Sequence, residues 1–195
     1  MKRFTLITIL LLSCFIANSQ EWTTEQILKA NTAKDIACLT IVEKDAIKYI
    51  NLCRLYPKEF AVNEVENYFG TKKYGNYVKN SKYRQSLIKY LNSMKPVSTL
   101  NFDIELYNYA KCLAKEQGPT GVIGHKRIKC KNGNFAECCS YGMDTGLDIA
   151  MQWLIDDKVE SLGHRINCLN SDYSKIGLSV HTHKKYGICA VADMM

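Results

Sequence analysis

The chain has 195 residues, nine cysteines and a formal net charge of +7 at pH 7. This length predicts a single domain with enough chain to bury a hydrophobic core. The lysines and arginines are spread along the sequence and are not interleaved with aromatic residues. They therefore indicate a solvated basic surface and argue against a nucleic-acid-binding protein.

Residues 1–19 have the pattern of a signal peptide. Lys2 and Arg3 precede an almost entirely apolar run over 4–16, and the small residues that follow suit cleavage before Gln20. The apolar run is short for a membrane span, and no later segment has the character of a transmembrane helix. Cleavage would lower the net charge from +7 to +5, because Lys2 and Arg3 are the only charged residues removed. The mature protein is therefore expected to be secreted or periplasmic.

The cysteine count agrees with export. Loss of Cys14 with the signal peptide leaves eight cysteines, an even number that predicts a disulfide framework in an exported chain. Eight cysteines allow 105 pairings, and the sequence does not choose among them. The alternative is lipid attachment at Cys14, for which the basic and apolar segments ahead of it are short. The eight cysteines are Cys38, Cys53, Cys112, Cys130, Cys138, Cys139, Cys168 and Cys189.

Residues 20–42 have weak helical character and are expected to form an N-terminal helical extension before the main domain, residues 43–195. Within that domain Asn101 is the expected N-cap of a helix that ends near Gly118, and Thr145 resembles the first residue of a capping box. Apolar periodicity predicts helices over about 43–55, 58–69, 86–94, 101–116 and 147–154.

The last part of the domain changes period. Residues 120–142 are rich in glycine and cysteine and are predicted to be a loop, whereas apolar residues alternate over 176–180 and 186–192. This alternation predicts two antiparallel strands joined by a turn at about 182–185. Several helices with a small antiparallel sheet predict an α+β fold, or a layered α/β/α arrangement.

Two glycine–histidine pairs, with an acidic residue between them, are the strongest candidates for a polar site. His125 follows Gly124, His164 follows Gly163, and Glu137 lies in an apolar stretch between them. A carboxylate in apolar surroundings needs a partner or carries a raised pKa. Imidazoles and a carboxylate can bind a metal, transfer protons or bind a ligand.

A second acid is expected close before His164. Asp156 and Asp157 fall at the end of a predicted helix, where negative charge is unfavourable, so at least one of them should have a partner. Glu160 is a further candidate. His181 and His183 alternate near a strand end, a spacing that can chelate a metal. Their position beside a turn makes exposed histidines the favoured interpretation of that pair.

The chain resembles the CAP superfamily, also called the SCP domain, of cysteine-rich secretory, antigen 5 and pathogenesis-related proteins, and is most similar to its bacterial members. The resemblance covers roughly residues 43–195 and keeps the family's order of motifs. The matching pieces are IKYINLCRLYPKEFA, LNFDIELYNYAKCLA, GHKR, AECCSYG, AMQWLIDDKVESLGHRINCLN and YSKIGLSVHTHKKYGICAVADM.

The resemblance implies a three-layer α/β/α sandwich whose central cleft holds two histidines and two acids. By motif, His125 and His164 take the places of the histidines and Glu137 that of the first acid. The second acid is not cleanly matched, and Asp156 or Asp157 is favoured over Glu160. The chain departs from the family's Gly-Glu-Asn at Ala136-Glu137-Cys138, which changes the hydrogen bonding near the acid.

The resemblance further implies an exported protein that binds a divalent metal, a lipid or sterol-like molecule, or another protein in this cleft. His125 and His164 would be the metal ligands, and two imidazoles with a carboxylate suit zinc better than magnesium. One alternative is a metal-assisted envelope hydrolase with Glu137 as the general base. No oxyanion hole is evident, so an enzyme is the less favoured interpretation. Another alternative is a structural interaction module held by disulfides.

Overall fold

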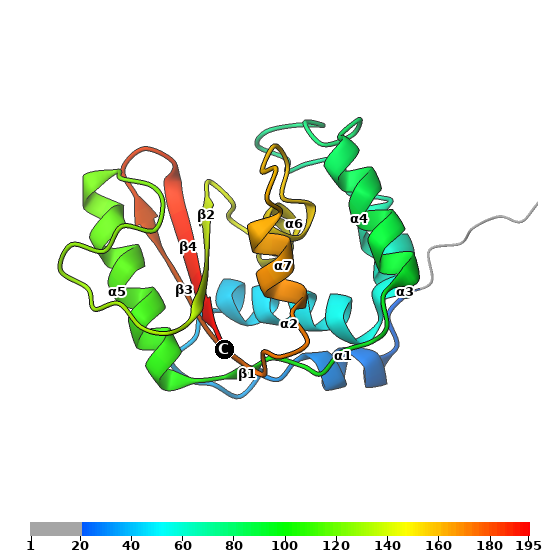
Figure 1. The fold of residues 1–195 in the computed structure, drawn as a ribbon, viewed down its shortest axis with the longest axis horizontal. Helices are drawn as coiled ribbons and strands as arrows, with labels where there is room; N and C mark the ends of the chain where they lie inside the picture. The colour runs from blue at the N-terminus through cyan, green and yellow to red at the C-terminus, as the bar shows by residue number, and fades with distance from the viewer. Residues whose placement is uncertain (1–20) are drawn as a thin grey trace, which may run out of the picture.

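The computed structural model describes residues 21–195, so the predicted signal peptide and Cys14 lie outside the described residues. The described chain has an α+β fold in which a sheet lies between two helical layers (Figure 1). Helix α5 packs on strands β3 and β4, and α2, α6 and α7 lie on the other side of the sheet. The predicted fold class is confirmed.

The elements are, in chain order, α1 (Thr24–Ala30), α2 (Ile41–Leu55), α3 (Pro57–Phe60), a π-helical turn η1 (Ala61–Val65), α4 (Lys82–Ser93), β1 (Asn101–Phe102), α5 (Ile104–Thr120), β2 (Ala136–Tyr141), α6 (Gly146–Ile155), α7 (Gly163–Leu169), β3 (Lys175–His183) and β4 (Gly187–Met194). Among residues 21–195, none of these helices has the length and apolar character needed to cross a bilayer.

The sheet is larger than the predicted hairpin. β3 and β4 pair antiparallel as expected, but β2 adds antiparallel to β4 and β1 adds parallel to β3, in the order β1-β3-β4-β2. The sheet is therefore mixed: the predicted antiparallel pair is present, and β1 adds a parallel pairing at its edge. β2 falls within 120–142, the stretch predicted as a loop. It was missed because both of its faces are covered, so its sequence lacks an apolar–polar alternation.

Helix boundaries follow capping side chains. The Thr40 side chain accepts a hydrogen bond from the Glu43 amide and Glu43 reaches back to Thr40, so α2 begins slightly before the predicted start. Asp103, and not Asn101, caps α5, because Asn101 belongs to β1. α5 continues to Thr120, with a proline in its last turn, and ends where Gly121 adopts a φ of 73°.

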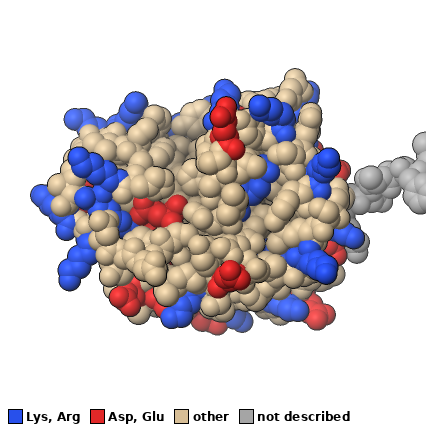
Figure 2. All heavy atoms as spheres, in the orientation of Figure 1, with Lys and Arg blue, Asp and Glu red and all other residues tan. Residues whose placement is uncertain are grey.

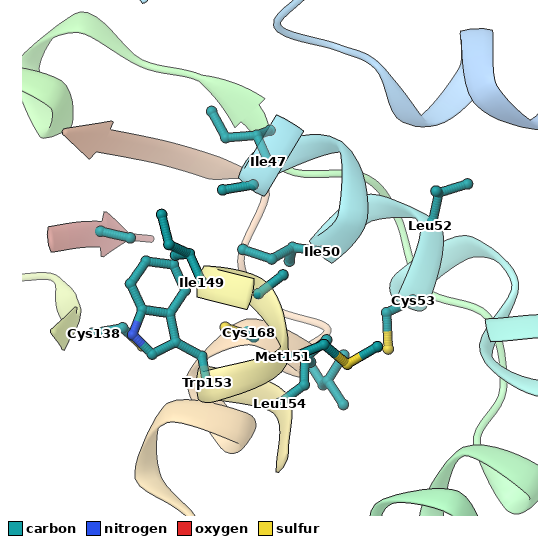
Figure 3. Packing of buried hydrophobic residues seen from close by; sticks show 14 of the residues in the cluster. Ile47, Ile50, Leu52, Cys53, Cys138, Ile149, Met151, Trp153, Leu154 and Cys168 are labelled. Atoms are coloured by element: carbon teal, nitrogen blue, oxygen red, sulfur yellow. The ribbon is translucent and has the colours of Figure 1, made fainter. Parts of the chain in front are cut away.

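One hydrophobic core joins the N-terminal segment to the rest of the chain. Ile47 and Ile50 of α2 pack against Ile149 and Trp153 of α6, and residues before 43 belong to the same cluster (Figure 3). On the other face, α5 lies so close to β3 that a Cβ at Gly177 would be 1.9 Å from a backbone nitrogen of the helix. This position requires glycine, because any side chain would separate the helix from the sheet.

The described cysteines form one disulfide, Cys112–Cys130, which ties α5 to the loop before β2. The prediction of disulfide bonding is confirmed for this pair, whereas the other six described cysteines are free thiols. Five of the six described free cysteines are buried, where a thiol packs as a small apolar group, and Cys38 is exposed. A large buried core explains why a chain of this length does not depend on several cross-links.

Candidate functional site

A cleft opens along the edge strand β2, between the loop after α5 and the helices α6 and α7. Its volume is about 330 Å³. On the face drawn in Figure 2, acidic atoms lie at the bottom of a hollow near the centre, while most Lys and Arg side chains lie around the outline. The lining combines apolar and polar residues: Val78, Ile123, Met151, Ile155 and Val159 with Tyr77, His125, Cys139, Tyr141, Gln152, Asp156, Asp157 and His164.

His125 and Glu137 meet at one wall of this cleft. The Nδ1 atom of His125 lies 2.8 Å from Oε1 of Glu137. The hydrogen bond to Glu137 raises the pKa of His125 above its ordinary value, and partial burial opposes this shift. The imidazole is 58% exposed whereas the carboxylate is 9% exposed, so the carboxylate lies behind the ring and the ring faces solvent.

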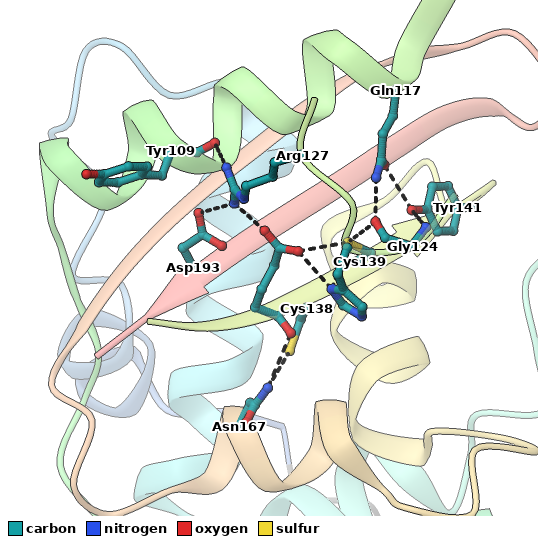
Figure 4. A network of polar contacts seen from close by, with 11 residues as sticks. Tyr109, Gln117, Gly124, Arg127, Cys138, Cys139, Tyr141, Asn167 and Asp193 are labelled. Carbon is teal, nitrogen blue, oxygen red and sulfur yellow. Dashed lines mark hydrogen bonds and ion pairs between the residues drawn. The ribbon is translucent and has the colours of Figure 1, made fainter. Parts of the chain in front are cut away.

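A buried arginine holds the carboxylate of Glu137. Glu137 lies directly opposite Asp193 in the β2–β4 pairing, and two like charges in that position repel. The guanidinium of Arg127 binds both carboxylates and also donates to the Tyr109 carbonyl (Figure 4). Burial and the nearby charge of Glu137 raise the pKa of Asp193. Arg127 therefore makes this acidic pair possible and fixes Glu137 toward His125.

The backbone before His125 is clamped from two sides. The Gly124 amide donates to Oη of Tyr141 at 2.8 Å, and the same hydroxyl donates to Gln117 at 2.9 Å. The amide group of Gln117 in turn donates to the Gly124 carbonyl. Gly124 has a φ of 96°, so glycine is required at this point of the chain. This clamp sets the place of His125 although its ring is exposed.

Cys139 is the third polar group around His125. Its thiol lies 3.7 Å from Nδ1 of His125 and 3.9 Å from Oε1 of Glu137. The three residues offer donor atoms that all lie within 4.8 Å of one another, so this group could hold a metal ion. Burial raises the pKa of the Cys139 thiol, and the negative charge of Glu137 adds to the effect.

His164 and Asp156 form a second imidazole–carboxylate pair on the opposite wall. Nδ1 of His164 lies 2.7 Å from Oδ1 of Asp156, whose other oxygen accepts from the His164 amide at 3.0 Å and the Arg165 amide at 3.4 Å. Asp156 thus binds the free amides at the start of α7 as well as the ring. It ends α6 in the left-handed conformation, with a φ of 55°.

Arg165 joins this second pair to the core. Its buried guanidinium donates to the carbonyls of Leu154 and Ile155 at 2.7 Å each, to the Tyr83 carbonyl at 2.9 Å and to Ser86 at 3.0 Å. These bonds hold the end of α6 against α4 and position the residues that follow. Arg165 is thus structural, because its guanidinium serves backbone carbonyls and a hydroxyl of the core.

The other predicted acids have different positions. Asp157 lines the cleft but accepts a hydrogen bond from Ser81, the N-cap of α4, and the acid that bonds to His164 is Asp156. Glu160 is exposed and does not line the cleft. Gly163 has an ordinary helical backbone, and the left-handed residue beside it is Leu162, with a φ of 52°. Glycine is therefore needed before His125 but not before His164.

The two imidazoles face each other with ring centres 6.3 Å apart. Two imidazoles that share a tetrahedral zinc ion have ring centres about 5 Å apart, since each Zn–N bond is about 2.0–2.1 Å. The rings would need to approach each other for both to bind one ion. His125, Glu137 and Cys139 are already close enough.

His181 and His183 do not belong to the cleft. His183 is buried, its Nε2 bonds to the Val122 carbonyl at 3.1 Å, and its Nδ1 accepts from two amides in the following turn. The prediction that it would be exposed was wrong. Burial lowers the pKa of His181.

The sequence did not point to Arg127, Asp193, Cys139 or Tyr141. A usable signal existed, because Glu137, Cys139 and Tyr141 alternate and share one face of β2. Recognising residues 136–141 as a strand would have placed all three side chains on the same face of the sheet. Asp193 could not have been found in this way, because it lies opposite Glu137 only through the β2–β4 register.

The family model described as the cysteine-rich secretory protein family, CAP, matches residues 79–193. This range covers more than half of the chain and contains the residues of both imidazole–carboxylate pairs. No curated protein matches the chain.

Proposed function

The chain belongs to the cysteine-rich secretory protein family, CAP, and we propose that it is an exported binding protein whose cleft holds a divalent metal ion at His125. His164 faces this ion from the opposite wall and takes part in binding the molecule that enters. The observation that carries the proposal is the group of donor atoms from His125, Glu137 and Cys139, of which His125 and Cys139 line the cleft. Family membership supports residues 43–195 as the binding domain.

The ligand that best suits the cleft is a small lipid-like or sterol-like molecule with one polar end. Ile123, Met151 and Ile155 supply apolar wall, while His125 and His164 supply polar groups. Pockets for small molecules commonly have this composition and volumes of about 300–1,000 Å³. The polar end would meet the metal ion and the His164 imidazole, and the apolar part would lie along α6.

Binding is favoured over hydrolysis because Glu137 is not free to act as a base. One of its oxygens pairs with His125 and the other with Arg127. A general base needs an oxygen within hydrogen-bond reach of the water that it activates. The Cys112–Cys130 disulfide supports export, since disulfides persist in oxidising compartments.

Zinc titration of chelator-treated protein, followed by calorimetry, tests the proposal. The native chain should bind zinc, and His125→Ala should weaken binding at least tenfold, about 1.4 kcal/mol. His181→Ala is the matched control, because it removes an imidazole outside the cleft and should leave affinity unchanged. Equal zinc affinity of the native chain and His125→Ala would overturn the proposal.

A further inference from the structure

We propose that Cys139 is a ligand of the metal ion at His125, which makes this a thiolate site selective for zinc over magnesium. The inference rests on the proposed metal binding and adds the identity of the donors. It assigns Nδ1 of His125, one oxygen of Glu137 and Sγ of Cys139 to the ion, and leaves the fourth position open to the cleft.

The spacing of the three donors is close to that of a tetrahedral zinc site. With zinc bonds of about 2.0–2.3 Å, neighbouring donors lie about 3.3–3.6 Å apart. Sγ of Cys139 lies 3.7 Å from Nδ1 of His125 and 3.9 Å from Oε1 of Glu137. The His125–Glu137 separation is 2.8 Å, because one proton joins these atoms. Only this separation must widen, by about half an ångström, when the ion replaces the proton.

The donors are held in place before any ion binds. Cys139 lies inside β2, where it pairs with Val191 and is 7% exposed. Arg127 holds the second oxygen of Glu137, and the Gly124 clamp holds the backbone before His125. A donor set fixed by its surroundings loses little conformational entropy on binding, which favours affinity.

The charges also balance. The carboxylate of Glu137 and the thiolate of Cys139 neutralise the two charges of the ion, and Arg127 remains paired with Asp193. Binding releases the thiol proton of Cys139. The Nδ1 proton of His125 is also released when the ring is charged, and it moves to Nε2 when the ring is neutral. No oxidant or reductant is involved, and the ion keeps its oxidation state.

The donor set decides which metals bind. Thiolates favour zinc and other soft ions, whereas magnesium requires oxygen ligands in octahedral geometry. His164 is not needed as a ligand, because its ring centre lies 6.3 Å from that of His125 and its Nδ1 atom is held by Asp156. Magnesium should therefore not displace zinc even at large excess.

Cobalt(II) titration of the chelator-treated native chain, without oxygen, tests the inference. Cobalt bound by a thiolate gives an intense near-ultraviolet charge-transfer band that nitrogen and oxygen ligands do not give. We expect this band in the native chain, in His164→Ala and in Cys189→Ser. Cys189 is the matched control, since it is also buried on the α5 side of the sheet but lies outside the donor group. Cys139→Ser should lose the band and bind zinc at least tenfold more weakly.

A measurement on the native chain alone covers the case in which Cys139→Ser fails to fold. X-ray absorption at the zinc edge of the native chain should show one sulfur ligand at about 2.3 Å. Cobalt binding without the band, or zinc binding without a sulfur ligand, would overturn the inference and leave the proposed function intact. Absence of any zinc or cobalt binding would overturn both.

Discussion

The two imidazole–carboxylate pairs have nearly the same separation but are built by different means. The His125–Glu137 pair joins a loop to a strand and depends on a buried ion network, whereas the His164–Asp156 pair lies at the junction of two helices. The first ring is 58% exposed and the second 22%. One wall of the cleft therefore presents its imidazole to solvent, and the other is part of the core.

This difference explains how one cleft can combine recognition with stability. The α6–α7 wall needs Asp156 and Arg165 to satisfy buried backbone groups, so its residues serve the fold and the site together. On the opposite wall, the carboxylate of Glu137 bonds to few backbone groups. The polar residues of this wall are therefore available for binding. We expect variants of the α6–α7 wall to change the stability of the protein. Variants of the wall that carries Glu137 should change ligand binding and the titration of His125.

The largest effect is expected for Arg165→Ala. The change leaves the carbonyls of Leu154 and Ile155 buried without their donor, and each such group costs about 1–3 kcal/mol. We expect the free energy of unfolding, measured with urea, to fall by about 3–5 kcal/mol. Ile166→Ala, an exposed change on the same helix, should stay within about 0.5 kcal/mol. Equal losses of unfolding free energy in Arg165→Ala and Ile166→Ala would contradict the structural role of the α6–α7 wall.

Removal of the Cys112–Cys130 disulfide should increase the backbone mobility of the wall that carries His125. Cys112 and Cys130 are 18 residues apart and enclose the segment that carries His125. The double change Cys112→Ser, Cys130→Ser should cost about 3 kcal/mol. Amide hydrogen exchange should rise over residues 121–131 and stay unchanged over residues 156–164. A uniform rise over both segments would mean that the disulfide stabilises the whole domain and not this wall.

The acids of the two pairs should differ in their contribution to stability. Asp156→Asn keeps a side chain that tolerates the left-handed backbone but weakens three hydrogen bonds, so we expect a loss of about 1–3 kcal/mol. Glu137→Gln removes one of two opposed carboxylates, and the relief of repulsion offsets part of the lost pairing with Arg127. The two effects oppose each other, so the loss of stability should be smaller than that of Asp156→Asn. Urea unfolding measures both, and a larger loss in Glu137→Gln would contradict the comparison.

Sequence reasoning reaches the partners of the two histidines to different depths, for a physical reason. The site at His164 is local: a helix end, acids and a histidine lie within a few residues, so helix rules and dipole arguments already implied a partner for Asp156 or Asp157, and the structure pairs Asp156 with His164. The site at His125 is assembled by strand pairing, which brings Asp193 beside Glu137 across 56 positions of sequence. Periodicity does not encode that register, and β2 itself was taken for loop.

The smallest effect is the pH dependence of the exposed pair. The hydrogen bond to Glu137 raises the pKa of His125 above its ordinary value of 6.5. In chelator-treated protein, the NMR titration midpoint of the His125 ring should lie above that value and fall toward it in Glu137→Gln. Glu160→Gln, which removes an acid that does not line the cleft, should leave the midpoint unchanged.

The sign of the linked stability follows from the raised pKa. The folded state holds the proton on His125 more tightly than the unfolded chain does, so the contribution is fully present below the unfolded pKa. It is lost as the pH rises through the folded pKa. The native chain should therefore exceed His125→Gln in stability by more at about pH 5.5 than at about pH 9. The difference should be small, because solvent screens an exposed ring. A larger difference at the higher pH would mean that folding favours the neutral ring, against the pairing with Glu137.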